Sequence, residues 1–185
     1  MRMSKSDHFD IRKQGDAPHI RAPKPSDGPN VWRLIDAAGA LDANSLYCNL
    51  LQCSHFAATC ALAELDGEVI GWMSGHMPPD QPDTLFVWQV CVTDAARGLG
   101  LGQRLINSVL ERPVCEQVRN VECTITKQNA ASWALFHKVA RTLNADLKSQ
   151  PHFLRDTHLG GLHESEFRVT IGPFEANSPR SAKAA

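Results

Sequence analysis

The sequence has no pair of cysteines at CxxC spacing, the spacing that redox and zinc motifs use. It does contain six cysteines, and several sit inside apolar runs such as Val90-Cys91-Val92. Small buried thiols of this kind are typical of proteins in a reducing compartment. The pattern therefore argues against a disulfide framework and favours a cytoplasmic protein. The six cysteines are residues 48, 53, 60, 91, 115 and 123.

Long apolar runs and an excess of either charge are also missing. No uninterrupted apolar stretch approaches the ~18 residues of a membrane span, and no apolar segment follows the charged N-terminus. Lys plus Arg (19) nearly balances Asp plus Glu (20), so no strong net field directs the chain to nucleic acid or to an anionic membrane. We expect a soluble, cytoplasmic protein with neither kind of partner.

The histidines do not form a metal motif. His152, His158 and His163 lack metal-ligand spacing, and no carboxylate-histidine constellation accompanies them. We predict that the protein holds no metal.

A chain of 185 residues is expected to form one domain. Residues 1–16 and 174–185 are polar or rich in small residues and show no periodicity, which leaves little apolar surface to offset the entropy of ordering. We therefore expect two disordered tails around a single domain at 17–173.

The hydrophobic pattern predicts alternating helices and strands in that domain. Helical spacing, with cap residues at 25–28 and at Asn129, favours helices around 31–35, at 45–52, at 101–110 and after Asn129. Runs rich in β-formers favour strands at 60–64, 69–74, 85–92, 118–126 and 167–171. Asp66-Gly67 suits a type I′ hairpin turn. The nearly all-apolar segment 85–92 predicts a central strand buried on both faces, which opens a β-α-β unit.

The most informative segment is Arg97-Gly98-Leu99-Gly100-Leu101-Gly102, between that strand and the following helix. Three alternate glycines let backbone N–H groups converge on a pyrophosphate at a helix N-terminus, because no Cβ obstructs the approach. A Rossmann loop needs glycine at position 103, where Gln103 stands, and a Walker loop needs Gly-Lys-Ser/Thr. Glu122 does lie at the sequence distance from the loop that is expected for ribose recognition. The mismatch at Gln103 therefore weakens the alternative of a dinucleotide ligand but leaves it open.

This loop resembles the acetyl-CoA signature of the GNAT family, [RQ]-x-x-G-x-[GA] after a Val-x-Val strand, through Arg97, Gly100 and Gly102. The resemblance implies an α/β (α+β) fold with a mixed, mostly antiparallel sheet, splayed in the middle, and helices on both faces. The pantetheine arm would enter between segments 90–92 and 118–126, and a backbone N–H would stabilise the thioester oxyanion. The implied cofactor contacts are Val90, Cys91, Val92, Arg97, Gly98, Leu99, Gly100, Leu101, Gly102, Gln103, Asn129, Ser132 and Phe136.

Four further segments, 41–47, 86–90, 124–132 and 163–166, resemble the diaminobutyrate acetyltransferases of ectoine biosynthesis. The resemblance spans roughly 19–172. It implies acetylation of the γ-amine of L-2,4-diaminobutyrate, a role in osmoadaptation and a homodimer. The implied substrate-binding residues are Asp42, Tyr47, Trp88, His163, Glu164 and Glu166, with Trp88, Tyr47 and Glu164 catalytic.

Each of these residues also has an ordinary structural interpretation. Asp42 can cap the helix that starts near 45, and Tyr47 and Trp88 can be core aromatics. Glu164 and Glu166 alternate near the start of the last strand, which places both on one sheet face, either as a solvated strand end or as paired carboxylates for a cationic amine.

One departure from the GNAT pattern concerns the group that protonates the leaving thiolate. Many members carry a tyrosine on the helix after the Asn-x-x-Ser segment, where this chain has Phe136. Water, His137, Tyr47 or another group must then supply the proton. Two other functions stay open: a GNAT enzyme for another small amine or a peptide N-terminus, and a nonenzymatic acyl-CoA-binding regulator.

Overall fold

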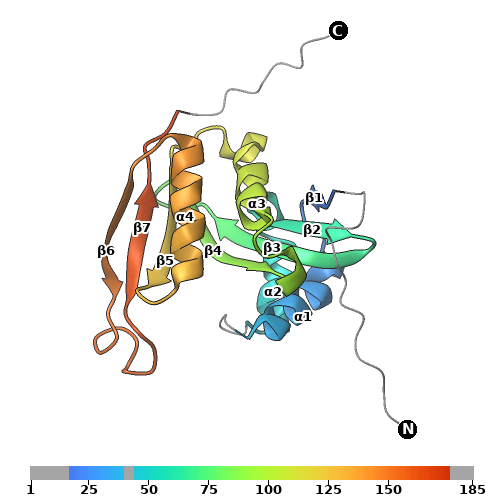
Figure 1. Ribbon diagram of the computed structural model, residues 1–185, viewed down its shortest axis with the longest axis horizontal. Coiled ribbons are helices and arrows are strands. Elements are labelled where there is room, and N and C mark those ends of the chain that lie inside the picture. Colours follow the sequence, from blue (N-terminus) through green and yellow to red (C-terminus); the bar gives the residue numbers. More distant parts are fainter. Residues whose placement is uncertain (1–16, 40–43, 176–185) are drawn as a thin grey trace.

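The computed structural model describes residues 17–39 and 44–175, which form one seven-stranded sheet with helices packed against it (Figure 1). The strand order is β1-β2-β3-β4-β5-β7-β6, and only the β4–β5 pair is parallel. The expected α/β fold with a mixed, mostly antiparallel sheet is confirmed. The strands are β1 (His19–Arg21), β2 (Ala61–Leu65), β3 (Glu68–His76), β4 (Thr84–Val92), β5 (Asn120–Thr126), β6 (Leu147–Phe153) and β7 (Glu166–Ile171). The helices are α1 (Gly28–Ala38), α2 (Leu46–Gln52), α3 (Leu101–Leu110) and α4 (Ala130–Leu143), with short 3₁₀ turns η2 (Pro25–Asp27), η3 (Ala57–Thr59), η4 (Asp94–Ala96) and η5 (Pro113–Cys115).

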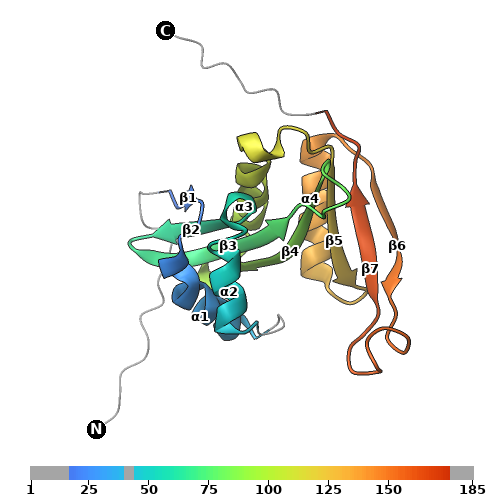
Figure 2. The same ribbon diagram turned by 180° about the vertical axis from the view of Figure 1, so that it is seen from behind.

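Two hydrophobic layers hold the helices to opposite faces of the sheet (Figures 1 and 2). On one face, α1 buries Val31 and Ile35 against Trp72 of β3. On the other face, α3 and α4 share a larger cluster, to which they contribute Leu105 and Val139. Apolar residues three and four positions apart put each helix's buried stripe on its sheet-facing side.

The β2–β3 hairpin follows the predicted turn chemistry. Asp66 and Gly67 both have positive φ, at 52° and 80°. A type I′ turn needs this conformation at both central residues, and its twist matches that of the flanking strands. The predicted hairpin is confirmed.

The sheet is split where the parallel pair meets. β4 pairs with β5 only from Thr84 to Phe86, opposite Asn120 to Glu122. Beyond Phe86 the two strands have no ladder pairing with each other, so β4 from Val87 and β5 from Cys123 diverge. The splayed centre and the β4-α3-β5 unit expected from the sequence are both present.

Three details differ from the sequence-based expectations. β4 is central but not buried on both faces, because Trp88 is 48% exposed on the side where the sheet opens. β1 and β6 were not predicted: β1 is only three residues long, and β6 is a polar edge strand that contains Pro151. The buried core also reaches Phe174, one residue past the expected domain end at 173.

None of the helices within 17–39 and 44–175 is long and apolar enough to cross a membrane.

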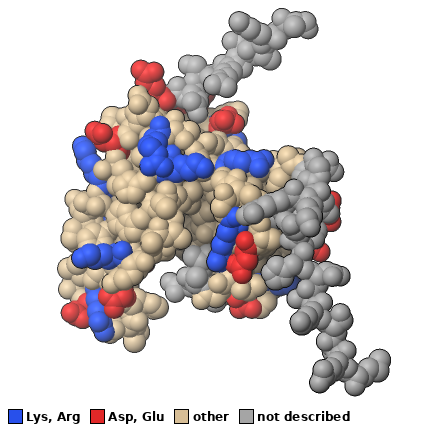
Figure 3. All heavy atoms as spheres, in the orientation of Figure 1, with Lys and Arg blue, Asp and Glu red and all other residues tan. Residues whose placement is uncertain are grey.

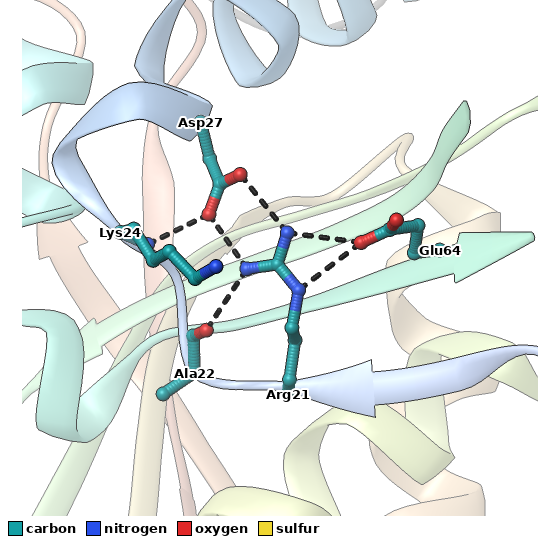
Figure 4. Close-up of polar contacts among 5 residues, drawn as sticks. All are labelled: Arg21, Ala22, Lys24, Asp27 and Glu64. Carbon is teal, nitrogen blue, oxygen red and sulfur yellow. Dashed lines mark hydrogen bonds and ion pairs between the residues drawn. The ribbon is translucent and has the colours of Figure 1, made fainter. Parts of the chain in front are cut away.

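A charged cluster ties the start of the domain to the sheet (Figure 4). Arg21 donates to both carboxylate oxygens of Asp27, at 2.7 and 2.9 Å, and its Nε and Nη2 donate to Glu64 of β2 at 3.1 and 2.9 Å. Asp27 occupies the expected cap position before α1, but its side chain does not cap that helix. It accepts instead from Arg21 and from the Lys24 backbone N–H at 2.7 Å. The cluster therefore links β1, η2 and β2.

We expect Asp27→Asn to destabilise the fold by about 2 kcal/mol at pH 7, because Asp27 is only 11% exposed and the change leaves Arg21 without its nearest negative charge. The Arg21 hydrogen bonds hold the pKa of the Asp27 carboxyl below its ordinary value of 3.8. A depressed pKa stabilises the fold in full above the unfolded pKa, and this stabilisation is lost as the pH falls through the folded pKa. The difference in unfolding free energy between parent and variant should therefore shrink progressively below about pH 3.8.

Urea unfolding at several pH values measures this difference, and Glu68→Gln, at an exposed carboxylate, is the matched control. A variant as stable as the parent at pH 7 would contradict the structural role of the cluster.

Candidate active site

The split between β4 and β5 opens into a cleft of about 1560 Å³. Its walls come from the diverging strands, from the loop before α3 and from the first two turns of α4. In Figure 3 the surface is hollowed between the two halves of the molecule, and Lys and Arg side chains lie around the hollow. The volume exceeds the roughly 300–1,000 Å³ typical of small-molecule pockets. The cleft therefore suits a long ligand together with a second, smaller one.

The glycine loop forms one end of this cleft. Gly98 and Gly100 have positive φ, at 76° and 72°, and Gly100 is the residue before the first turn of α3. The first N–H groups of α3 have no acceptor within the helix, and the helix dipole adds partial positive charge there. An anion such as a pyrophosphate is the ligand that this end of the cleft favours.

Helix α4 supplies the facing wall. The Asn129 side chain accepts a hydrogen bond from the Ser132 backbone N–H at 3.0 Å, so the predicted N-cap is confirmed. Phe136, which is 4% exposed, lines the cleft at the position where the GNAT resemblance implies a tyrosine. Lys138 also lines it, and a Cβ added at Gly100 would lie 3.2 Å from its Nζ. Lys138 adds a positive charge beside the glycine loop.

Lys138 is a cleft residue that the sequence analysis did not predict. Its helical spacing could have identified it, because Ala131, Leu135 and Lys138 lie at positions i, i+4 and i+7 on one face of α4 and all line the cleft. Two other polar residues of this end have partners on the protein. Arg97 pairs with Asp94 at 3.0 Å, and the Gln103 amide donates to Thr142 of α4.

Aromatic and acidic side chains line the opposite end of the cleft. Trp88 lies in a β-bulge, because the β3–β4 register jumps from Ser74 opposite Gln89 to Gly75 opposite Val87. Its ring centroid is 6.4 Å from that of His76, the last residue of β3. Bulges of this kind re-aim side chains next to active sites.

Carboxylates from the chain around the start of β7 complete this end. Glu164 and Glu166 both line the cleft, but only Glu166 belongs to the strand. The prediction that both lie on one sheet face is therefore wrong for Glu164, which precedes β7. Glu164 is 59% exposed and lies 3.6 Å from Arg155.

Four further polar residues line the cleft and were not predicted as site residues. The Asn44 side-chain amide donates a 2.7 Å hydrogen bond to Gln89, and the other two are Thr124 and Thr126 of β5.

The structure brings together most of the residues predicted for the site. Leu99 and Tyr47 do not line the cleft, and Tyr47 is 69% exposed on α2. Asp42 lies outside the described residues, so its predicted role stays a prediction. The predicted residues that line the cleft are Trp88, Val90, Cys91, Val92, Arg97, Gly98, Gly100, Leu101, Gly102, Gln103, Asn129, Ser132, Phe136, His163, Glu164 and Glu166.

The thiols of the cleft are poor nucleophiles. Burial raises the pKa of the Cys91 thiol to about 11, and the thiol donates to the Leu34 carbonyl at 3.7 Å. Burial also raises the pKa of Cys123, well above its usual range. Because the thiolate is the reactive form, neither residue is suited to carry an acyl group.

Chelation should leave activity unchanged, because the predicted chemistry uses no metal-activated water. Within 17–39 and 44–175, no group of three or more His, Cys, Asp or Glu side chains is arranged to hold a metal ion. Initial rates before and after dialysis against a chelator measure the effect. A rate that is lost with the chelator and restored by zinc would contradict the prediction.

Comparisons with known proteins agree with this geometry. The model of the acetyltransferase (GNAT) family matches residues 31–140. A protein named L-2,4-diaminobutyric acid acetyltransferase from Methylotuvimicrobium alcaliphilum is 46% identical over 149 residues, which cover 80% of this chain and 87% of that protein. The protein of the same name from Halomonas elongata is 43% identical over 159 residues, covering 85% and 82%.

A solved structure is similar over nearly its whole length. It is diaminobutyrate acetyltransferase EctA from Paenibacillus lautus, in complex with its substrate L-2,4-diaminobutyric acid and coenzyme A. The TM-score is 0.83 and the sequence identity is 34%, over 89% of this chain and 99% of that one.

Proposed function

Because the chain belongs to the acetyltransferase (GNAT) family, we propose that it transfers the acetyl group of acetyl-CoA to the γ-amine of L-2,4-diaminobutyrate, a step of ectoine biosynthesis. The observation that carries the proposal is the similarity to diaminobutyrate acetyltransferases, at 43–46% identity over 80–85% of the chain. The chain also has the structural parts that this reaction needs: a split sheet, an anion-binding loop and an acidic acceptor end.

Acetyl-CoA binds along the split. Its pyrophosphate lies on the glycine loop at the start of α3, with Lys138 alongside, and its pantetheine arm lies between β4 from Val87 and β5 from Cys123. The unpaired strand edges offer backbone hydrogen bonds to the arm's amides, as an added strand would. Asn129, Ser132 and Phe136 border the same channel from α4. This arrangement directs the thioester to the bulge at Trp88.

The acceptor binds at the other end. A diamino acid presents an ammonium, a carboxylate and the reacting amine, so selective transfer requires that one ammonium be fixed. Glu164, with Glu166 and His163 nearby, anchors the α-ammonium through charge-assisted hydrogen bonds. Trp88 forms the apolar wall beside the thioester. Asp42 is a further substrate contact implied by the resemblance to this enzyme family, whereas Tyr47, which lies outside the cleft, is given no role in this proposal.

The chemistry is direct transfer. The γ-ammonium loses one proton to a base, and the nitrogen lone pair attacks the thioester carbonyl carbon. A backbone N–H of the β4 bulge stabilises the resulting oxyanion. The intermediate then collapses with cleavage of the carbon–sulfur bond, and the second nitrogen-bound proton passes to the sulfur, directly or through water. The products are the N-γ-acetyl derivative, coenzyme A and one released proton, with no acyl-enzyme.

The cellular setting and assembly are further parts of the proposal. All six cysteines are free thiols, which suits a reducing cytoplasm, where the enzyme serves osmoadaptation. A homodimer would cover apolar side chains that are exposed in one copy, among them Tyr47 and Leu162. Light scattering of the purified protein tests the assembly, since a monomeric mass at micromolar concentration would contradict it.

Coenzyme A release with a panel of amines tests the proposed function. Turnover that is fastest with L-2,4-diaminobutyrate supports it. Preference for a polyamine or a peptide N-terminus would keep the acetyltransferase but change its substrate. Acetyl-CoA binding without turnover on any amine would indicate a regulator instead.

A further inference from the structure

His76 lies at the closed end of the split between β4 and β5. It is the last residue of β3, and its partner on β4 is Phe86, which is also the last β4 residue that pairs with β5. The imidazole lines the cleft on the acceptor side. The adjacent bulge places Trp88, and with it the proposed position of the thioester, beside His76.

Three aromatic rings surround the His76 imidazole. Its centroid lies 5.3 Å from that of Phe86, 6.2 Å from Phe56 and 6.4 Å from Trp88. The ring is partly buried, and burial lowers its pKa below the usual 6.5. Among the described residues, His76 has no hydrogen bond or ion pair, so a ring nitrogen is available to a ligand. His76 is therefore a neutral proton acceptor at pH 7.

The ionisable groups that face the same cleft do not change this state. His163, Glu164 and Glu166 lie around the start of β7, Arg97 and Lys138 lie at the pyrophosphate end, and the thiols of Cys91 and Cys123 are buried in β4 and β5. Burial of the imidazole is the cause of the lowered His76 pKa. A neutral imidazole in a cleft, with a perturbed pKa and an unused nitrogen, has the properties of a general base.

The other candidates for this role are less well placed. Glu164 is exposed and lies beside Arg155, which favours an anchoring role over proton transfer. His163 is exposed and precedes β7, whereas His137 does not line the cleft. Tyr47 lies outside the cleft as well.

On the basis of the proposed function, we propose that His76 is the general base of the transfer and accepts a proton from the γ-ammonium of diaminobutyrate. The N–H electron pair stays on nitrogen and becomes the lone pair that forms the carbon–nitrogen bond. The proton resides on the imidazole and is passed to water as the product leaves. Trp88 and Phe86 pack around the ring, which lines the cleft.

The test is a pair of variants at His76, with His19→Gln at an exposed β1 position as the matched control. We expect His76→Gln to lower kcat by roughly 10²- to 10⁴-fold with the affinity for acetyl-CoA nearly unchanged. His76→Phe keeps an aromatic ring in the cluster and should be equally slow. If Phe restores activity where Gln does not, His76 acts by packing and the proposal is wrong.

The pH profile separates a base from a structural residue. In the parent, kcat/KM should fall as the pH drops through an inflection below 6.5, because the imidazolium cannot accept a proton. That acidic limb should be absent in both variants. In a third variant, His76→Ala, added imidazole should restore part of the rate. A variant with near-parental kcat, or one that keeps the acidic limb, would overturn the assignment.

The two proposals fail separately. The rate of the parent with diaminobutyrate tests the substrate alone. The ratio of variant to parent rates, measured with whichever amine the parent acetylates best, tests His76 alone.

Discussion

The Gly100→Val variant is expected to fold and to lose acetyl-CoA binding, with the dissociation constant raised at least ~100-fold, or about 2.7 kcal/mol. Gly100 has φ of +72°, a conformation that costs an L-residue about 1–2 kcal/mol and a β-branched residue more. The added side chain would also meet Lys138 Nζ, since the Cβ alone would lie 3.2 Å from it. Both effects move the loop N–H groups away from the pyrophosphate.

The matched control is Gly67→Val in the β2–β3 turn. Gly67 has φ of +80° and no atom within 4 Å of an added Cβ, so it has comparable backbone strain without a contact in the cleft. Calorimetric titration with acetyl-CoA should show loss of binding in the first variant and near-parental affinity in the second. Parental affinity in a folded Gly100→Val protein would remove the loop from the cofactor site.

Glu164→Gln is expected to lower kcat/KM for diaminobutyrate by about 1.5–3 kcal/mol, or ~10- to 150-fold, with acetyl-CoA affinity nearly unchanged. The substitution keeps the shape of the side chain but removes the charge that anchors the α-ammonium. Glu164 is exposed in the free protein, so its hydrogen bond to the substrate gains strength only when the bound ligand excludes water.

Substrate length provides a second readout of the same anchor. Ornithine and lysine are longer by one and two methylenes, and a fixed α-ammonium would push their terminal amines past the thioester. They should be poor substrates of the parent. Glu116→Gln, at an exposed carboxylate outside the cleft, should behave as the parent. Unchanged kcat/KM in Glu164→Gln would contradict the anchoring role.

The glycine loop before α3 and the cap of α4 could be predicted from sequence because local backbone chemistry determines both. Two of the three alternate glycines, Gly98 and Gly100, have positive φ, which glycine adopts readily, whereas Gly102 lies within α3. Asn129 caps α4 as its position before an apolar helix indicated. Such signals lie within a few neighbouring residues, so they can be recognised without knowledge of the tertiary fold.

The acceptor end depends on contacts between distant segments, and less of it could be predicted. His76 and Trp88 come together from two strands, next to a register shift between β3 and β4. Lys138 approaches Gly100 because α3 and α4 lie on the same face of the sheet. Neither relation has a local sequence signature. The resemblance implied Glu164 and Glu166 as substrate contacts, but the expectation that both lie on one sheet face is wrong because β7 starts at Glu166.

The central claim is tested most directly by coenzyme A release from the purified protein with acetyl-CoA and L-2,4-diaminobutyrate, followed by NMR of the product. We predict rapid release that requires diaminobutyrate, with the acetyl group on the γ-nitrogen only. Equal rates with lysine or with a diamine that lacks the α-carboxylate, or a product acetylated at the α-nitrogen, would contradict it.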